Sequence, residues 1–263
     1  MDQPLNGPQA YTHNDRLARL EEIAARLRRH FGADLLALGL YGSLSRATDG
    51  PFSDIELHAV VNGAADQFAY EWSAGPWKAE VDVYSPQAFL DCAAELDEFW
   101  PITHGAYAHV TPLHDPQSIF PRAARAVFDH SAADFDRLMA EVLVGDLYEV
   151  IGKARNAIAL ERKSSLAGEA VDAARYAACL LGLAHRHLFT TGPAAFSESL
   201  RLPDPPAHFA AYLELVLSGD LRDNRRVAAA LDALWDGMEE WAERRGLRLH
   251  RGLDELLAAE GPE

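Results

Sequence analysis

The chain has 263 residues and a mass of 28.9 kDa, is 49% hydrophobic and 24% charged, and carries a formal net charge of −16. This composition predicts one or two folded domains, and the acidic excess argues against general binding to nucleic-acid phosphates. Cys92 and Cys179 form no CxxC pair or histidine cluster, which argues against a disulfide framework or a zinc site. With no apolar segment of ~20 residues and no signal peptide, we expect a cytoplasmic protein without membrane partners.

The first half of the chain alternates helices with short strands. Apolar residues at helical spacing predict a helix over residues 15–31, which Gly32 ends. Short apolar or alternating runs predict strands over residues 35–41, 55–61, 68–72, 77–84 and 106–112. A turn at residues 73–76 makes a hairpin of the third and fourth strands, and a helix is predicted over residues 86–96. This half is therefore predicted to be α+β.

The second half of the chain is predicted to be helical. Helical patterns cover residues 122–129, 132–160, 169–188, 207–217 and 222–244. Such a series of helices favours a helical bundle. The change in pattern predicts two domains, a mixed sheet with flanking helices over residues 1–130 and a bundle over residues 131–263.

Acidic residues are concentrated in residues 47–100, where eleven of them accompany one basic residue, Lys78. Charge alone allows two interpretations. The segment is a solvated acidic surface, or it lines a cleft that attracts metal ions or a polycationic ligand.

A glycine and a serine end the predicted strand at residues 35–41. A strand that ends in Gly42-Ser43 allows close approach of its backbone to a phosphate, with a hydroxyl and amides directed at it. Arg46 follows and can hold a charged oxygen. The three residues together suit a triphosphate tail.

Three carboxylates are expected to meet on the predicted sheet. Asp54 and Glu56 are two residues apart, so on a strand they project from one face, with Ile55 buried opposite. Glu80 lies on a strand that we expect beside them. Carboxylates together with substrate phosphates are typical ligands of Mg²⁺, which supports phosphoryl or nucleotidyl transfer. The ordered set predicts such a site.

Several longer motifs add a resemblance to a known family. They are YGSLSRATDGPFSDIE (41–56), YEW (70–72), WKAEVDVYS (77–85), WPITHG (100–105), GKARN (152–156), GLAHR (182–186) and EEWAER (239–244). In these motifs the sequence resembles the nucleotidyltransferase fold shared with DNA polymerase beta. It closely resembles the aminoglycoside 4′-O-nucleotidyltransferases of the kanamycin nucleotidyltransferase type. The resemblance covers nearly the whole chain, in order and with similar spacing.

The resemblance implies transfer of AMP from Mg·ATP, or from another nucleoside triphosphate, to the 4′-hydroxyl of aminoglycosides such as kanamycin, tobramycin or amikacin. Pyrophosphate is released, and resistance follows. The resemblance also implies a homodimer in which two subunits share the active-site cleft. The implied site residues are Gly42, Ser43 and Arg46 for the triphosphate, Asp54, Glu56 and Glu80 for Mg²⁺, Glu149 as catalytic base, and Lys153 for phosphate.

Glu149 and Lys153 are four residues apart and therefore neighbours on one helical face. Taken alone, such a pair is an ordinary surface ion pair. The resemblance favours the other interpretation, in which the carboxylate takes the proton of the sugar hydroxyl and the lysine stabilises phosphate charge.

The ammonium groups of an aminoglycoside give the acidic segment a purpose. Glu71, Glu80 and Glu149 are the expected substrate contacts, and Asp82, Asp97 and Glu98 are further acids that could pair with amines. Phe99 and Gly145 stand where the kanamycin enzyme has acids. These departures leave the antibiotic range, and the choice between 4′- and 4″-hydroxyls, open.

Two other functions fit the same fold. One is a nucleotidyltransferase that acts on a protein or a nucleotide, which would keep the metal carboxylates without needing Glu71. The other is a non-catalytic, antitoxin-like module, whose usual mark is loss of those carboxylates.

Overall fold

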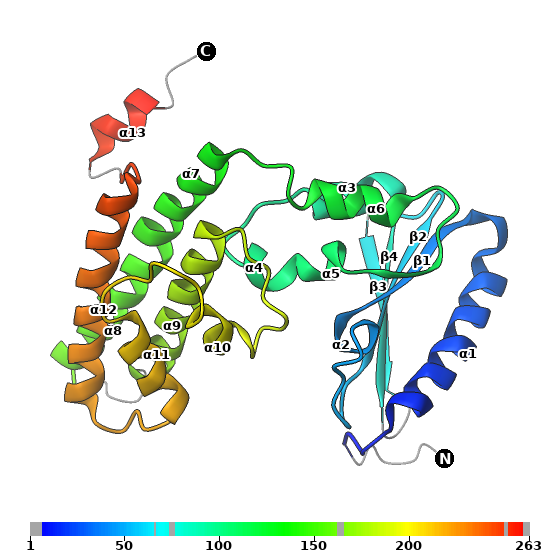
Figure 1. Ribbon diagram of the computed structural model, residues 1–263, viewed down its shortest axis with the longest axis horizontal. Helices are drawn as coiled ribbons and strands as arrows, with labels where there is room; N and C mark the ends of the chain where they lie inside the picture. Colours follow the sequence, from blue (N-terminus) through cyan, green and yellow to red (C-terminus); the bar gives the residue numbers. More distant parts are fainter. Residues whose placement is uncertain (1–6, 66, 74–76, 162–165, 250–251, 260–263) are drawn as a thin grey trace. The chain divides into compact units, whose positions relative to one another are not determined.

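The chain forms two compact units in the computed structural model, which describes residues 7–65, 67–73, 77–161, 166–249 and 252–259 (Figure 1). The first unit comprises Met1–Glu95 and His104–Asp129, and the second comprises Leu96–Thr103 and His130–Glu263. The segment Leu96–Thr103 groups with the later helices, whereas the predicted division at residue 130 places it in the first domain. No helix in the described part of the chain is long and apolar enough to cross a membrane.

A five-stranded mixed sheet forms the centre of the first unit. Its strands are β1 (Leu35–Tyr41), β2 (Ile55–Val61), β3 (Gln67–Ser73), β4 (Lys78–Tyr84) and β5 (Thr111–His114), in the order β3-β4-β2-β1-β5. The β2–β4 pair is parallel, and the other three pairs are antiparallel. The predicted α+β class is confirmed. Residues 74–76, within the predicted hairpin turn, lie outside the described residues.

Helices cover both faces of this sheet (Figure 1). They are α1 (His13–Phe31), α2 (Gly42–Ser45), α3 (Pro86–Ala93), α5 (Gly105–Ala108) and α6 (Ile119–Ala126). Helix α1 packs its apolar stripe, including Leu20 and Ile23, against Leu57 and Val81 of the sheet. Because side chains alternate along a strand, the residues between these core positions point to the other face, where α3, α5 and α6 pack.

The strand predicted over residues 106–112 is wrong in its first half. The chain there forms the short helix α5, in which the amides of Tyr107 and Ala108 donate to the carbonyl of His104, and β5 begins only at Thr111. The Tyr107 ring stacks on the buried His58 ring, with centroids 5.4 Å apart. Tertiary packing of this ring overrides the weak strand signal of the local sequence.

The second unit is helical, as predicted. Its helices are α4 (Trp100–Thr103), α7 (Ala132–Val142), α8 (Tyr148–Ala159), α9 (Leu166–Ala184), α10 (Ala195–Ser199), α11 (Phe209–Ser218), α12 (Asn224–Arg245) and α13 (Leu253–Ala259). The single helix expected over residues 132–160 is interrupted by a π-helical turn, Leu143–Leu147. The turn contains Gly145, and such turns are frequent at functional sites.

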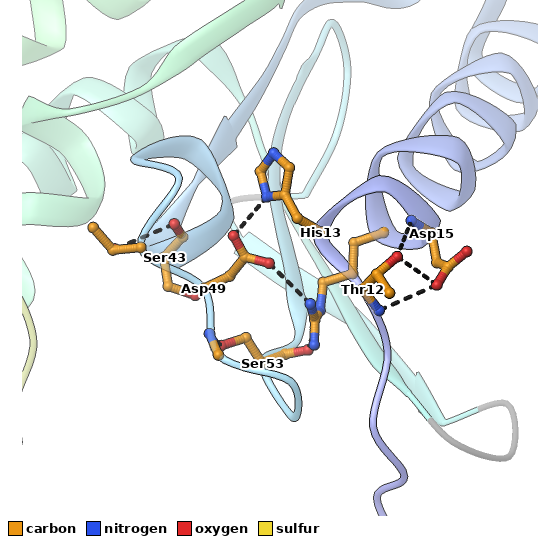
Figure 2. Close-up of polar contacts among 9 residues, drawn as sticks. Thr12, His13, Asp15, Ser43, Asp49 and Ser53 are labelled. Atoms are coloured by element: carbon orange, nitrogen blue, oxygen red, sulfur yellow. Dashed lines mark hydrogen bonds and ion pairs between the residues drawn. The ribbon is translucent and has the colours of Figure 1, made fainter.

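A buried ion pair holds the loop between α2 and β2. One nitrogen of the Arg16 guanidinium lies 2.9 Å from Asp49 Oδ2, and another donates to the Ser53 carbonyl. His13 Nδ1 lies 2.6 Å from the other Asp49 oxygen (Figure 2). These contacts fasten the start of α1 to the loop that separates Ser43 from Asp54.

Candidate functional site

The turn after β1 is shaped by the absence of a side chain at residue 42. Gly42 has φ +74°, and a Cβ atom placed there would lie 1.7 Å from Glu56 Oε2. The Glu56 carboxylate therefore rests against the Gly42 backbone, and glycine alone fits both the conformation and the space. The amides of Arg46 and Thr48 donate to the Ser43 carbonyl and close the turn. Ser43 and Arg46, predicted to hold a triphosphate, lie within it.

The three carboxylates predicted to bind metal lie near one another at one end of the sheet. Glu56 of β2 pairs in parallel register with Glu80 of β4, Asp54 directly precedes β2, and Ile55 is fully buried on the opposite face. The predicted adjacency of these strands is confirmed. Burial raises the pKa of Glu56 to about 7, with smaller contributions from Asp54 and Glu80. The Glu56 carboxylate is therefore buried next to two further negative charges, and burial is the larger of the two effects.

A lysine ammonium lies among these carboxylates. Lys78 Nζ is 2.5 Å from Glu71 Oε1, 3.3 Å from Glu80 Oε2 and 4.0 Å from Asp54 Oδ2. The hydrogen bond to Glu71 raises the pKa of Lys78, and Glu80 adds to the effect. Sequence reasoning singled out Lys78 only as the lone base of an acidic segment. Its spacing of two from Glu80, which puts both on one strand face, was the signal that could have placed it.

The chemistry of this cluster fits Mg²⁺, which prefers a few carboxylate ligands. A cation bound here would favour the charged form of Glu56, whose pKa burial and, to a smaller extent, Asp54 and Glu80 raise. Across the described residues, however, no group of three or more His, Cys, Asp or Glu side chains is arranged to hold a metal ion. Asp54 and Glu80 are instead turned toward the Lys78 ammonium. The metal set therefore stays a prediction.

Asp82 shares a strand face with Glu80 but is directed into the unit. Its Oδ2 accepts a hydrogen bond of 2.8 Å from the Tyr41 hydroxyl and lies 3.7 Å from Nδ1 of the buried His58. Burial raises the pKa of Asp82, although the Tyr41 hydrogen bond opposes this. These contacts give Asp82 Oδ2 partners within the unit, and the suggestion that Asp82 pairs with a substrate amine stays a prediction.

The residues predicted to carry the acid–base chemistry lie in the second unit, on α8. Lys153 Nζ lies 2.9 Å from Glu149 Oε1, and both side chains are exposed. The hydrogen bond that Lys153 donates to Glu149 raises the pKa of Lys153. The predicted residues are thus divided between the units, with the triphosphate and metal residues, together with Glu71, in the first.

A second acidic group surrounds the π-helical turn of this unit. Burial raises the pKa of Asp146, with further increases from Glu98 and Glu149. Phe99 stacks on Tyr176, with ring centroids 5.8 Å apart.

Comparison with known proteins identifies the family. Residues 117–248 match the KNTase C-terminal domain. Two proteins described as aminoglycoside nucleotidyltransferase (4′), from Staphylococcus aureus and from a Bacillus species, are each 34% identical over 242 residues. Each match covers 92% of this chain and 96% of the relative. The chain belongs to the aminoglycoside 4′-nucleotidyltransferase family.

A solved structure agrees with this family in its fold. The nucleotidyltransferase-like protein from Exiguobacterium sibiricum 255-15 superposes with a TM-score of 0.56 at 10% sequence identity. The superposition covers 92% of this chain and 81% of that one. At this identity the likeness concerns the fold alone, and it confirms the predicted nucleotidyltransferase fold of this family member.

Proposed function

We propose that this chain transfers a nucleotidyl group, AMP from ATP, to the 4′-hydroxyl of an aminoglycoside antibiotic and thereby inactivates the drug. The observation that carries the proposal is the cluster of Asp54, Glu56, Glu80 and Glu71 beside the Gly42–Ser43 turn. It occurs in a chain 34% identical over 92% of its length to aminoglycoside 4′-nucleotidyltransferases. A nucleoside triphosphate is the donor that this family requires.

The nucleotide is assigned to the first unit. Ser43, Arg46 and the Gly42 backbone hold the triphosphate, and Asp54, Glu56 and Glu80 hold Mg²⁺. The ion, when bound, neutralises phosphate charge and aligns the α-phosphate. Support for this assignment comes from the position of Glu56 against Gly42, which puts the carboxylates directly beside the phosphate-binding turn.

Glu149 is assigned the role of general base and Lys153 that of phosphate contact. The Glu149 carboxylate takes the proton of the 4′-hydroxyl as the sugar oxygen forms a bond to the α-phosphorus. The bond from this phosphorus to the bridging oxygen breaks, and pyrophosphate leaves. The Lys153 ammonium, 2.9 Å from Glu149, stabilises charge on the phosphate oxygens.

The acidic groups of both units are assigned to the ammonium groups of the antibiotic. Glu71 and Glu80 already bind one ammonium, that of Lys78, which is the chemistry that a substrate amine presents. In the helical unit, Glu98 and Asp146 are the carboxylates adjacent in sequence to Phe99 and Gly145. We assign them the amine contacts that those two departures remove.

The transfer is tested with acceptors that differ at one position. Purified protein is incubated with Mg·ATP and either tobramycin, which carries a 4′-hydroxyl, or a 3′,4′-dideoxy kanamycin, which lacks it. We expect pyrophosphate release and a mass increase of one adenylyl group with tobramycin only. Transfer to the dideoxy compound identifies reaction at the 4″-hydroxyl. Transfer to neither, with nucleotide consumed on a protein or nucleotide acceptor, overturns the substrate assignment.

The metal assignment is tested by Asp54→Asn. We expect this variant to bind Mg·ATP about tenfold or more weakly in calorimetry, because Mg²⁺ is held by only one or two protein carboxylates besides substrate phosphates. Binding equal to that of the unsubstituted protein removes Asp54 from the metal set.

The proposed homodimer with a shared cleft is tested by mixing two inactive variants. Asp54→Asn and Glu149→Gln each lack one part of the site. If two subunits contribute to each site, mixed dimers contain one intact site and recover part of the turnover. Light scattering that shows a monomer, or no recovery after exchange of subunits, contradicts this arrangement.

A further inference from the structure

A layer of polar side chains lies one residue pair further along the same sheet face as the metal carboxylates. Glu56 pairs with Glu80, and the next pair on that face is His58 with Asp82. Tyr41, which precedes Gly42, pairs with Glu56 across the β1–β2 ladder. The layer of Tyr41, His58 and Asp82 thus lies next to the Gly42 turn, Glu56 and Glu80.

The three side chains contact one another. The Tyr41 ring stacks on the His58 ring at 4.0 Å between centroids, with planes 10° apart, and its hydroxyl reaches past this ring to Asp82 Oδ2 at 2.8 Å. His58 Nε2 lies 3.2 Å from the Ala106 carbonyl, and the Tyr107 ring stacks on its other side. Tyr41 is 8% and His58 1% exposed. Each ring is therefore held in one position.

This layer connects strands that are not neighbours. In the order β3-β4-β2-β1-β5, β2 separates β1 from β4, so backbone hydrogen bonds do not join them. The Tyr41–Asp82 hydrogen bond joins them directly. A buried polar contact of this kind requires one geometry, whereas an apolar layer tolerates small shifts.

We propose that Tyr41, His58 and Asp82 are positioning residues of the transfer site, which hold the Gly42–Ser43 turn in fixed register with Glu56 and Glu80. The inference rests on the proposed function in that the turn binds the triphosphate and the two carboxylates bind its cation. Tyr41 acts on the turn through the adjoining Gly42, and Asp82 acts on Glu80 through the strand that they share.

Tyr41→Phe is the direct test, with Tyr84→Phe as matched control. Phenylalanine keeps the stack on His58 and removes only the hydroxyl that reaches Asp82. Tyr84 is also buried on this sheet face, but its hydroxyl lies 3.3 Å from that of Tyr107 and does not reach β1. We expect Tyr41→Phe to weaken Mg·ATP binding in calorimetry and to lower kcat/KM for ATP by about 10- to 100-fold, the range for residues that orient metal ligands. The KM for the antibiotic stays unchanged, and Tyr84→Phe binds Mg·ATP normally.

Substitution of Asp82 tests the same contact from the other side. Asp82→Asn keeps an oxygen that accepts from Tyr41 and should retain Mg·ATP binding, whereas Asp82→Leu should match Tyr41→Phe. The double variant Tyr41→Phe/Asp82→Leu should bind no more weakly than Asp82→Leu alone, because both changes remove the Tyr41–Asp82 hydrogen bond. Melting temperatures identify any variant that fails to fold.

Two results overturn the inference. One is equal Mg·ATP affinity in Tyr41→Phe and Tyr84→Phe, and the other is strictly additive losses in the double variant. Failure of the proposed function is distinguishable, because it appears as no transfer to aminoglycosides by the unsubstituted protein, while its Mg·ATP affinity still compares the variants.

Discussion

Two ion pairs of equal length lie in the two units. Arg16 and Asp49 are 2.9 Å apart with side chains 1% and 2% exposed, whereas Lys153 and Glu149 are 2.9 Å apart and 54% and 65% exposed. The first pair fixes a loop beside the Gly42–Ser43 turn. Solvent stabilises both members of the second pair, so either can exchange its partner at little cost in free energy. Burial, rather than distance, separates a pair that holds the fold from one that can change partners.

The largest effect is expected from Glu149→Gln. Glutamine cannot accept the hydroxyl proton, so turnover should fall by about 10²- to 10⁴-fold. Mg·ATP affinity and the melting temperature should stay unchanged, because the side chain is exposed. Asp232→Asn is the control, since Asp232 forms a similarly exposed pair of 2.9 Å with Arg155 of the same helix α8. Normal turnover in Glu149→Gln removes the residue from its role as base.

The next effect is on stability, in Asp49→Ala. This change leaves the buried Arg16 guanidinium without its carboxylate and should lower the free energy of unfolding by about 3–5 kcal/mol. Chemical denaturation measures the loss. Asp220→Ala, which removes the partner of the exposed Arg222, should change it by less than about 1 kcal/mol. Equal losses in the two variants would contradict the distinction between buried and exposed pairs.

A third prediction concerns pH. The pKa of Glu56 is about 7 in the folded protein against an ordinary value of 4.5 in the unfolded chain, so between these pH values the folded state binds one more proton. The free energy of unfolding of the metal-free protein should therefore fall as pH rises through this window, by about 3 kcal/mol in total from this group.

Glu56→Gln removes the carboxylate and with it the loss of stability at high pH. The metal-free variant should be more stable than the unsubstituted protein at about pH 8 and similar at about pH 4. Melting curves at both pH values provide the measurement. A variant that is destabilised equally at both would show that the Glu56 charge is not crowded.

The smallest change in stability is expected from Lys153→Met. Its ammonium is exposed, so the melting temperature should stay the same, while turnover falls because phosphate charge loses a partner. Steady-state kinetics with varied ATP, alongside a thermal melt, measures both. A lower melting temperature would show that this exposed pair has a structural role.

Much of the first unit could be predicted from sequence, because the two-residue period of a strand is strict. That period placed Asp54 and Glu56 opposite the buried Ile55, and the strand of Glu80 was expected beside them. The parallel direction of that pairing, and its register, came only from the structure. The same period puts Asp82 on the face of Glu80. It does not predict which residues of that face are exposed to solvent and which are covered by other side chains. The inward contact of Asp82 with Tyr41 depends on the order of the strands in the sheet, which periodicity does not contain.

Two features of the helical regions could not be predicted for a different reason. Residues 143–147 continue the apolar character of the flanking helices. The local change from α-helical to π-helical hydrogen bonding can therefore not be recognised from the sequence pattern. Tyr107 lies in a short segment that was predicted to be a strand, and short apolar runs do not distinguish strand from helix by periodicity alone. The packing of the Tyr107 ring on His58 selects the helical conformation, and this contact joins residues far apart in sequence.

The Lys78 ammonium supplies positive charge to this cluster from within the chain. It contacts Glu71 and Glu80, so part of their mutual repulsion is offset without any bound ion. If magnesium binds here as proposed, a chelator should therefore stop the transfer while leaving the chain folded.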